Sequence, residues 1–408
     1  MLKEKMLVPQ LRFSEFEGEW KINKLGQIAK FLKGKGISKR DIINDGDNEC
    51  IRYGELYTTY NEVIDSIASK TNVALDVSVL SNENDVIIPS SGETQLDIVT
   101  ASCVLKKGVI LGGDLNIIRT NLNGVFLSYL LNNRKKKDIA KLSQGNSVVH
   151  LYNKQLATLN LNLPTPKEQQ KIANFLTSID NRIQTLEKKK TLLEQYKKGV
   201  MQKIFKQELR FKDDDGNAFA DWEKRRFSDV LFEHKLKSTG KEEVHSVSVH
   251  KGVINQIEHL GRSFSAKNTD HYSRALPNDI IYTKSPTGNF PLGIIKQNHI
   301  KEDVIISPLY GVFTPETKEL GYILHVYFES PINTSNYLSS IIQKGAKNTI
   351  NMTNNTFLSK KMLLPVFKKE QTKIANFLSS IDKNIALVSK KIKHTKTYKK
   401  GLLQQMFV

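Results

Sequence analysis

Several features that are common in exported or membrane proteins are missing from this chain. It has only two cysteines, Cys50 and Cys103, too few for a disulfide framework or a four-thiolate zinc site. Its longest apolar runs, such as Val86–Ile88, are far shorter than the roughly 18–20 residues of a membrane-spanning helix. Charged side chains interrupt the first eight residues, unlike a secretory leader. We therefore expect a cytoplasmic protein with two buried, unpaired cysteines and no membrane segment.

The motifs of several catalytic chemistries are also lacking. No Gly-x-x-x-x-Gly-Lys-Ser/Thr loop occurs, so ATP hydrolysis is not supported. No Pro-Pro pair occurs, although the active site of an amino-methyltransferase needs two prolines between a polar residue and an aromatic one. Asp279 precedes Lys284, but the Glu-x-Lys of a metal-dependent nuclease does not follow it. The sequence therefore predicts a non-catalytic chain without a metal site or a cofactor of its own.

Positive charge, in contrast, is plentiful. The chain has 61 Lys and Arg residues against 42 Asp and Glu residues, a net charge of +19 over 408 residues. Such an excess favours a polyanionic partner, although it says nothing about the fold. A hydrophobic content of 39% with 8% aromatics is typical of globular proteins, and the length suits two to four folded units.

An internal repeat organises the chain. Residues 168–180 (EQQKIANFLTSID) return as residues 370–382 (EQTKIANFLSSID), an offset of 202. The same offset relates Tyr-Lys-Lys-Gly at 196–199 to 398–401, and it relates the only two tryptophans, each preceded by Leu-Arg-Phe. The stretches between these matched ends show no obvious resemblance. The chain thus repeats its conserved-looking ends but carries a different stretch between them in each copy, so it presents two different surfaces. This pattern favours a role in recognition over a single catalytic centre.

Each repeated segment predicts a long helix. Apolar residues recur at three- and four-residue steps, and Pro164 and Pro166 stand just before the helix begins. A narrow, sustained apolar stripe favours pairing of the two helices as a coiled coil, in which Lys190 would be a polar seam residue that fixes the register. Antiparallel order is favoured because the chain enters the second variable stretch directly after Phe205. The alternative is that each helix packs on its own globular half. The predicted seam consists of Ile179, Ile183, Leu186, Leu193, Ile381, Ile385, Val388 and Ile392.

The variable stretches alternate short β-like runs with helical runs and many loops. Gly124–Asn132 is predicted as a helix, and Tyr322–Phe328 as one of the strands. The predicted fold is α/β (α+β), with two tandem mixed α/β domains separated by two long helices that form an antiparallel, pseudo-twofold symmetric coiled coil. The predicted boundaries are 1–163 for the first variable domain, 164–207 for the first long helix, 208–365 for the second variable domain and 366–408 for the second long helix.

Several loops of the variable domains combine small, polar and charged residues. Such side chains read base edges and hold phosphates, so these loops are candidates for DNA contact; the alternative for each is an ordinary solvated turn. The candidates in the first domain are Lys35, Lys39, Arg40, Ser90, Glu93, Thr94, Gln144 and Asn146. Those in the second are Lys251, Lys284, Ser285, Thr287, Asn289, Lys344, Lys347 and Asn348.

The basic excess lies mainly on the two repeated segments. Residues 167–206 hold ten Lys and Arg against four Asp and Glu, and residues 368–408 hold ten against two, so together they carry +14 of the +19. Three interpretations remain open. The helices run near DNA phosphates, they dock onto acidic protein partners, or they present a solvated basic face.

These features resemble the specificity subunits of Type I restriction-modification enzymes. The resemblance rests on Pro164–Ala173, its second copy at Leu364–Ala375, the Leu-Arg-Phe and Trp openings, and Tyr53-Gly54-Glu55-Leu56. It covers essentially the whole chain. The second copy lacks the second proline of Pro164-Thr165-Pro166, which should affect only the start of the helix.

The resemblance implies that each variable stretch is a target recognition domain. Each would read one half of a bipartite, asymmetric sequence in double-stranded DNA, and the helices would set the length of the nonspecific spacer. It also implies one copy of this chain per complex. The implied partners are two methyltransferase subunits, which use S-adenosylmethionine to modify adenine N6, and two restriction subunits that require ATP and magnesium.

Three alternatives are distinguishable by simple observations. A self-contained DNA methyltransferase or nuclease with duplicated DNA-binding arms would react with DNA, magnesium and S-adenosylmethionine on its own. A structural adaptor would show no sequence-dependent DNA binding with any partner. A specificity subunit of a related restriction system would assemble with a different set of subunits.

Overall fold

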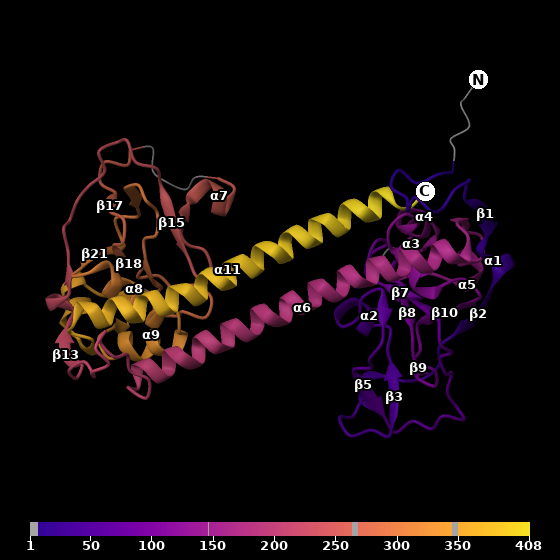
Figure 1. Ribbon diagram of the computed structural model, residues 1–408, viewed down its shortest axis with the longest axis horizontal. Helices are drawn as coiled ribbons and strands as arrows, with labels where there is room; N and C mark the ends of the chain where they lie inside the picture. The colour runs from indigo at the N-terminus through magenta and orange to yellow at the C-terminus, as the bar shows by residue number, and fades with distance from the viewer. Residues whose placement is uncertain (1–6, 146, 263–267, 345–349) are drawn as a thin grey trace. The chain divides into compact units, whose positions relative to one another are not determined.

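The computed structural model describes residues 7–145, 147–262, 268–344 and 350–408 (Figure 1). It divides into two compact units. Unit 1 consists of Met1–Lys189 and Val388–Val408, and unit 2 consists of Lys190–Leu387. The two longest helices are α6 (Pro166–Phe205) and α11 (Lys368–Gln405). Each unit therefore holds one variable domain, the start of one long helix and the end of the other.

The variable domain of unit 1 is built on a five-stranded sheet in the order β2-β10-β6-β8-β4. The central strand β6 is buried on both faces, because Val86 and Ile88 pack in one apolar cluster while Ile87 packs in another. The strands and helices of the unit are β1 (Lys21–Lys24), α1 (Leu25–Ile28), β2 (Ala29–Lys33), η1 (Lys39–Asp41), β3 (Asn48–Ile51), α2 (Glu55–Thr58), β4 (Val63–Ile64), β5 (Ser69–Thr71), β6 (Asp85–Pro89), β7 (Ser91–Gly92), β8 (Ser102–Val104), β9 (Ile110–Leu111), β10 (Leu115–Thr120), α3 (Gly124–Asn132), α4 (Lys136–Leu142), β11 (Val149–His150), α5 (Asn153–Leu156) and β12 (Asn160–Leu163).

The variable domain of unit 2 has a four-stranded sheet in the order β14-β21-β18-β19 and several two-stranded ribbons. Its elements are β13 (Glu223–Arg226), η2 (Phe227–Asp229), β14 (Leu231–Phe232), β15 (His245–Ser248), β16 (Gly252–Asn255), α7 (Gln256–Leu260), β17 (Ser273–Ala275), β18 (Ile280–Tyr282), β19 (Ile295–Gln297), β20 (Val304–Ile306), β21 (Gly311–Pro315), α8 (Lys318–Phe328), α9 (Pro331–Leu338), β22 (Gln343–Lys344), β23 (Ile350–Asn351), α10 (Asn354–Ser359) and β24 (Lys361–Leu364). The mixed α/β class predicted from the sequence is confirmed.

Two predicted elements had opposite outcomes. The helix predicted at Gly124–Asn132 is α3, whose N-terminus is capped by the Asn123 side chain. The strand predicted at Tyr322–Phe328 is wrong, because these residues belong to helix α8. The Thr317 side chain caps that helix, and Leu320, Leu324 and Phe328 recur every four residues on its buried face. This helical spacing outweighs the β-propensity of the tyrosine, isoleucine and valine residues between them.

The start of one long helix packs against the end of the other within each unit. In unit 1, Leu176 and Ile183 of α6 share an apolar cluster with Leu402 of α11. The ion pairs Asp180–Lys399 and Glu187–Lys396 show that residue numbers rise on α6 as they fall on α11, so the two segments are antiparallel. In unit 2, Lys197 pairs with Asp382. Asp382 and Lys399 are the repeat counterparts of Asp180 and Lys197, so the same pair occurs once in each unit.

The predicted seam residues lie between these segments to different depths. Ile179, Ile183, Ile381 and Val388 are buried, whereas Leu186, Leu193, Ile385 and Ile392 are half-buried. Lys190 has a partly exposed side chain that pairs with Glu194 on its own helix, at 3.7 Å. The cross-helix polar contacts described above are instead the two Asp–Lys pairs and the Glu187–Lys396 pair, which the sequence-based interpretation did not identify.

The end of the chain completes the core of unit 1. Met406 and Phe407 are 3% and 4% exposed, and the Phe407 ring lies 5.6 Å from that of Phe126 and 6.4 Å from that of Trp20. The Leu11 backbone N–H also donates to the Gln405 carbonyl oxygen. The repeat counterpart of Phe407 is Phe205, whose ring lies 5.9 Å from that of Trp222 in unit 2.

Truncation of this ring should destabilise unit 1. We expect Phe407→Ala to lower the free energy of unfolding by about 3–5 kcal/mol, since a buried aromatic side chain is lost and a cavity remains. Each unit contains one tryptophan, so Trp20 fluorescence during urea unfolding of a Trp222→Phe background reports on unit 1 alone. The matched control is Phe205→Ala in a Trp20→Phe background, where Trp222 reports on unit 2 alone. An unchanged Trp20 transition in Phe407→Ala would show that the chain end is dispensable.

Two further sequence-based expectations concern the cysteines and the membrane. Both cysteines are buried and unpaired, and burial raises the pKa of Cys50 to about 11 and that of Cys103 to about 12. Both therefore remain thiols at neutral pH. In the described part of the chain, no helix combines the length and the apolar character that crossing a bilayer requires.

Candidate nucleic-acid interface

Several loops predicted to contact DNA meet in unit 1. The Lys35 backbone N–H donates to the Leu111 carbonyl oxygen at 3.0 Å, which joins the loop after β2 to the end of β9. The Gly113 backbone N–H donates to the Gly36 carbonyl oxygen at 2.6 Å, which joins the same loop to the β9–β10 connection. The Ser90 backbone N–H donates to the Asp114 carbonyl oxygen at 2.7 Å, which joins the loop after β6 to the same connection. Residues far apart in the sequence are therefore neighbours here because β2 and β6 flank β10.

The loop that contains Gln144 joins the same group. Strand β7 pairs with β11, which places Ser91 opposite His150, and the Gln144 backbone N–H donates to the His150 carbonyl oxygen at 2.9 Å. We call residues 34–36, 90–94, 112–114 and 144–151 the unit 1 loop cluster; its Asn146 lies outside the described residues. The cluster gathers predicted residues from three separate stretches of sequence.

The residues of unit 1 that were predicted to contact DNA differ in solvent exposure and in whether they already form hydrogen bonds within the chain. Lys35, Glu93, Thr94 and Gln144 are exposed, whereas Ser90 is buried, with its Oγ 3.4 Å from Asp114 Oδ1. The Thr94 hydroxyl donates to Asp97 Oδ2 at 2.6 Å, so it is already engaged within the chain. The exposed residues Lys39 and Arg40 belong to η1, which Ser38 caps.

The sequence-based interpretation missed the aromatic side chains beside the unit 1 loop cluster. The Tyr57 hydroxyl donates to the Ser91 carbonyl oxygen at 2.9 Å, and the Tyr53 ring lies 6.5 Å from the Tyr57 ring. The exposed Tyr152 ring stacks on His150 with 6.2 Å between the ring centroids. Tyrosine hydroxyls are common phosphate contacts. The four-residue spacing of Tyr53 and Tyr57 around α2 is the signal that would have identified this pair.

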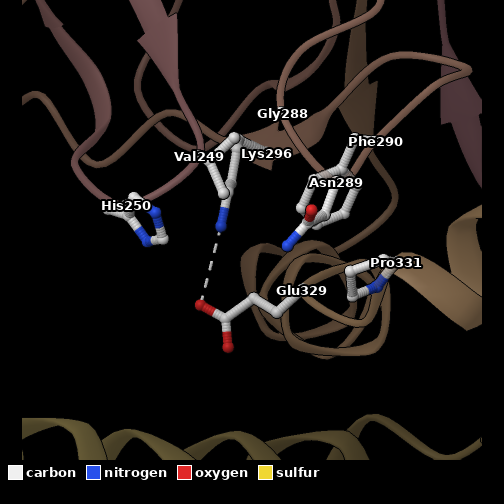
Figure 2. A pocket seen from close by; sticks show the side chains of 8 residues that line it. All are labelled: Val249, His250, Gly288, Asn289, Phe290, Lys296, Glu329 and Pro331. Carbon is white, nitrogen blue, oxygen red and sulfur yellow. Dashed lines mark ion pairs between the residues drawn. The ribbon is translucent and has the colours of Figure 1, made fainter. Parts of the chain in front are cut away.

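In unit 2, two predicted loops line one pocket of about 440 Å³ (Figure 2). The β15–β16 turn contributes His250, and the loop after β18 contributes Asn289. Figure 2 shows Lys296 extending between these two side chains toward Glu329, and its Nζ lies 3.7 Å from Glu329 Oε1. Lys296 is only 4% exposed, and burial lowers the pKa of its ammonium group. The pocket therefore combines an imidazole, an amide, a cation and a carboxylate.

A tight turn presents the tip of the second loop. Thr287 and Phe290 exchange two backbone hydrogen bonds of 3.0 and 2.9 Å, which leaves Asn289 exposed between them. Lys284 is half-buried with a positive φ of 52°, and burial lowers the pKa of its ammonium group. Ser285, Thr287 and Lys251 are exposed. The backbone of Lys344 lies in β22, while Lys347 and Asn348 fall outside the described residues.

Both loop groups supply hydrogen-bond donors, acceptors and positive charge at exposed tips. These are the side chains that contact base edges and phosphates. Within residues 7–145, 147–262, 268–344 and 350–408, no group of three or more His, Cys, Asp or Glu residues is arranged to hold a metal ion.

Sequence comparisons identify related proteins. Residues 17–195 match the family model for the Type I restriction modification DNA specificity domain. The chain is 28% identical over 231 residues to the Type I restriction enzyme MjaVIII specificity subunit of Methanocaldococcus jannaschii, a match covering 54% of this chain and 52% of that protein. The putative MjaX specificity subunit of the same organism is 27% identical over 212 residues, covering 48% and 44%. The chain thus spans about half the length of the curated relatives that it matches.

A solved structure has the same fold over almost the whole chain. It is the crystal structure of the Type-I restriction-modification system S subunit from M. genitalium. The match has a TM-score of 0.62 and 14% sequence identity, and it covers 98% of this chain and 99% of that chain. At this level of identity the likeness extends to the fold.

Proposed function

We propose that this chain is a specificity subunit of a Type I restriction-modification enzyme, which recognises DNA for that enzyme and catalyses no step itself. Each variable domain reads one half of a bipartite, asymmetric target. The lengths of α6 and α11 set the nonspecific spacer between the halves. The observation that carries this proposal is the recurrence of one Asp–Lys contact beneath two dissimilar domains. The scaffold is the same in both units, while the loops that it presents differ.

We assign the chemistry to partner subunits. Two methyltransferase subunits bind S-adenosylmethionine and modify adenine N6, and two restriction subunits use ATP and magnesium. An adenine must leave the duplex to be methylated, and the pocket that receives it belongs to the methyltransferase. This division of labour agrees with the missing Walker and Pro-Pro motifs.

The repeated Tyr-Lys-Lys-Gly segments are the proposed docking sites of the two methyltransferase subunits. Tyr196 and Tyr398 are 52% and 57% exposed, although each lies within a long helix. Outside the adjacent residues and backbone of its own helix, a Cβ added to Gly199 or Gly401 would meet no described atom within 4 Å. A glycine inside a helix lowers the stability of the helix by about 0.5–1 kcal/mol relative to alanine. Close approach of another chain to the bare backbone would explain why both repeats have a glycine at this position. Two identical surfaces suit two copies of one partner.

The recognition role is tested by Asn289→Ala in a complex reconstituted with methyltransferase subunits. We expect the wild-type complex to methylate adenines within one bipartite sequence of a randomised DNA library. The variant should lose about 5- to 150-fold of its discrimination at one base position, because a good side-chain–base pair contributes about 1–3 kcal/mol. The measurement is sequencing of methylated adenines.

Gln144→Ala is the matched control, since it removes an exposed amide from the other variable domain and should relax the other half-site only. Relaxation of both halves by one substitution would contradict the modular proposal. Methylation or cleavage by the purified chain alone, with DNA, magnesium and S-adenosylmethionine, would contradict the non-catalytic role.

A further inference from the structure

A cluster of four polar side chains connects the variable domain of unit 1 to both long helices. The Tyr129 hydroxyl, from α3, donates to the Asp180 carboxylate on α6. Lys399 on α11 places its Nζ 2.7 Å from Asp180 Oδ1 and 3.3 Å from Oε2 of Glu62, which directly precedes β4. The Lys399 ammonium also lies 5.2 Å from the centroid of the Tyr129 ring. One lysine of the second repeat thus contacts the first variable domain and the first long helix at once.

Unit 2 contains the same arrangement. The Tyr322 hydroxyl, from α8, donates to the Asp382 carboxylate on α11. Lys197 on α6 places its Nζ 2.7 Å from Asp382 Oδ1 and 2.7 Å from Oε2 of Glu329, which directly follows α8. We call each cluster a polar lock; the residues are Tyr129, Asp180, Lys399 and Glu62 in unit 1, and Tyr322, Asp382, Lys197 and Glu329 in unit 2.

The two polar locks have different sequence origins. Their aspartates and lysines are related by the repeat offset of 202, but Tyr129 and Tyr322 are 193 residues apart. The glutamate precedes the tyrosine by 67 residues in unit 1 and follows it by seven in unit 2. The tyrosines lie on the helices that follow β10 and β21, outside the repeat offset, whereas the glutamates come from different places in the two variable domains. The recurrence indicates that the long helices require a tyrosine hydroxyl and a carboxylate from any variable domain that packs on them.

The energetics favour positioning over simple stabilisation. The lysine side chains are only 12% and 16% exposed. Partly buried ion pairs give little net stability compared with apolar packing, whereas fixing a register is their best-attested role. Because each lysine comes from the opposite repeat, a lock closes only when both long helices are aligned.

A second contact near each lock restricts rotation. The Asn123 backbone N–H, at the N-cap of α3, donates to Gln169 Oε1 at 3.1 Å, and the Thr317 hydroxyl, at the N-cap of α8, donates to Gln371 Oε1 at 2.6 Å. Gln169 and Gln371 are repeat counterparts. The helix of each variable domain is thus held at its N-cap and at its tyrosine. Two points fix the direction of a helix, whereas one point leaves it free to turn.

We propose that the polar locks are positioning devices that set the angle at which each recognition domain is held on the long helices, and hence the separation of the bases that the two domains read. This inference rests on the proposed bipartite recognition. It also means that a foreign variable domain keeps one preferred spacer on this scaffold only if it presents a hydroxyl and a carboxylate to the same Asp–Lys pair.

The test is a complex of the Tyr129→Phe/Tyr322→Phe chain with methyltransferase subunits. Its substrates are duplexes with both half-sites and with spacers from two base pairs shorter to two base pairs longer than the preferred length. Wild type should methylate one length selectively. The double variant should raise methylation at the neighbouring lengths, relative to the preferred one, by at least about 10-fold, since each missing hydroxyl frees its domain to turn. The half-site sequences should not change, and each single variant should show an intermediate effect.

Tyr337→Phe is the matched control, because the Tyr337 hydroxyl donates to the Phe357 carbonyl oxygen inside the same variable domain. It removes a buried hydroxyl without touching a long helix, so its spacer profile should equal that of wild type. If the double variant lowers the unfolding temperature but keeps the wild-type spacer profile, the locks are merely structural and the inference is overturned. If wild type itself shows no bipartite target, the proposed function fails first.

Discussion

If residues 209–363 are replaced by the corresponding variable domain of a Type I specificity subunit, the complex with methyltransferase subunits should methylate a target that differs in one half only. The expected effect is large. A half-site of several bases, each discriminated by about 1–3 kcal/mol, corresponds to a preference of roughly a thousand-fold or more. In the proposed function, the loops of unit 2 read one half-site with their own side chains, while the scaffold contacts recur in both units. The measurement is a map of methylated adenines in cells that express the exchanged chain.

The reciprocal exchange of residues 9–163 is the control, and it should change the other half alone. The donor domain should be chosen so that its tyrosine and carboxylate superpose on Tyr322 and Glu329. A donor that lacks them should retain its half-site but accept a broader range of spacers. A change in both halves after a single exchange would show that the domains do not read independently.

The sequence was most informative where local patterns decide the structure. The repeat located both long helices, and the helix predicted at Gly124–Asn132 is α3. Local patterns misled at Tyr322–Phe328, where β-favouring residues occupy a helix whose cap, Thr317, lies outside the predicted run. Cap and spacing together would have given the correct assignment.

The candidate interface was only partly accessible from sequence. Exposed lysine, amide and hydroxyl residues could be selected by type, but the neighbourhood of Lys35, Ser90 and Gln144 depends on strand pairings between distant segments. Asp180 and Lys197 belong to the repeated segments and were visible in the sequence, but their partners, Lys399 and Asp382, lie on the opposite helix. Their role follows only from the antiparallel order that brings Lys399 to Asp180. Residue type alone does not specify which distant strands and helices pair with each other.

Removal of seven residues from each long helix should shorten the spacer of the target. The matched deletions are 186–192 in α6 and 388–394 in α11, which are repeat counterparts. Seven residues preserve the 3.5-residue period of the seam, so the seam residues that remain stay on the apolar face. Each helix loses about 10 Å, which equals at most about three base pairs of duplex at 3.4 Å per base pair. We therefore expect the preferred spacer to fall by about one to three base pairs, with both half-sites unchanged, in a methylation assay over a ladder of spacer lengths.

A deletion in α6 alone provides the decisive contrast. Asp180 and Lys197 bracket residues 186–192 on α6, and Asp382 and Lys399 bracket residues 388–394 on α11. Matched deletions shorten both intervals equally, so both Asp–Lys pairs can still form. A one-sided deletion leaves the intervals unequal by seven residues, so at most one pair can close, and we expect methylation of every spacer length to fall sharply. An unchanged spacer after the matched deletion would refute the idea that the paired helices measure the distance between half-sites, whatever the recognition domains read.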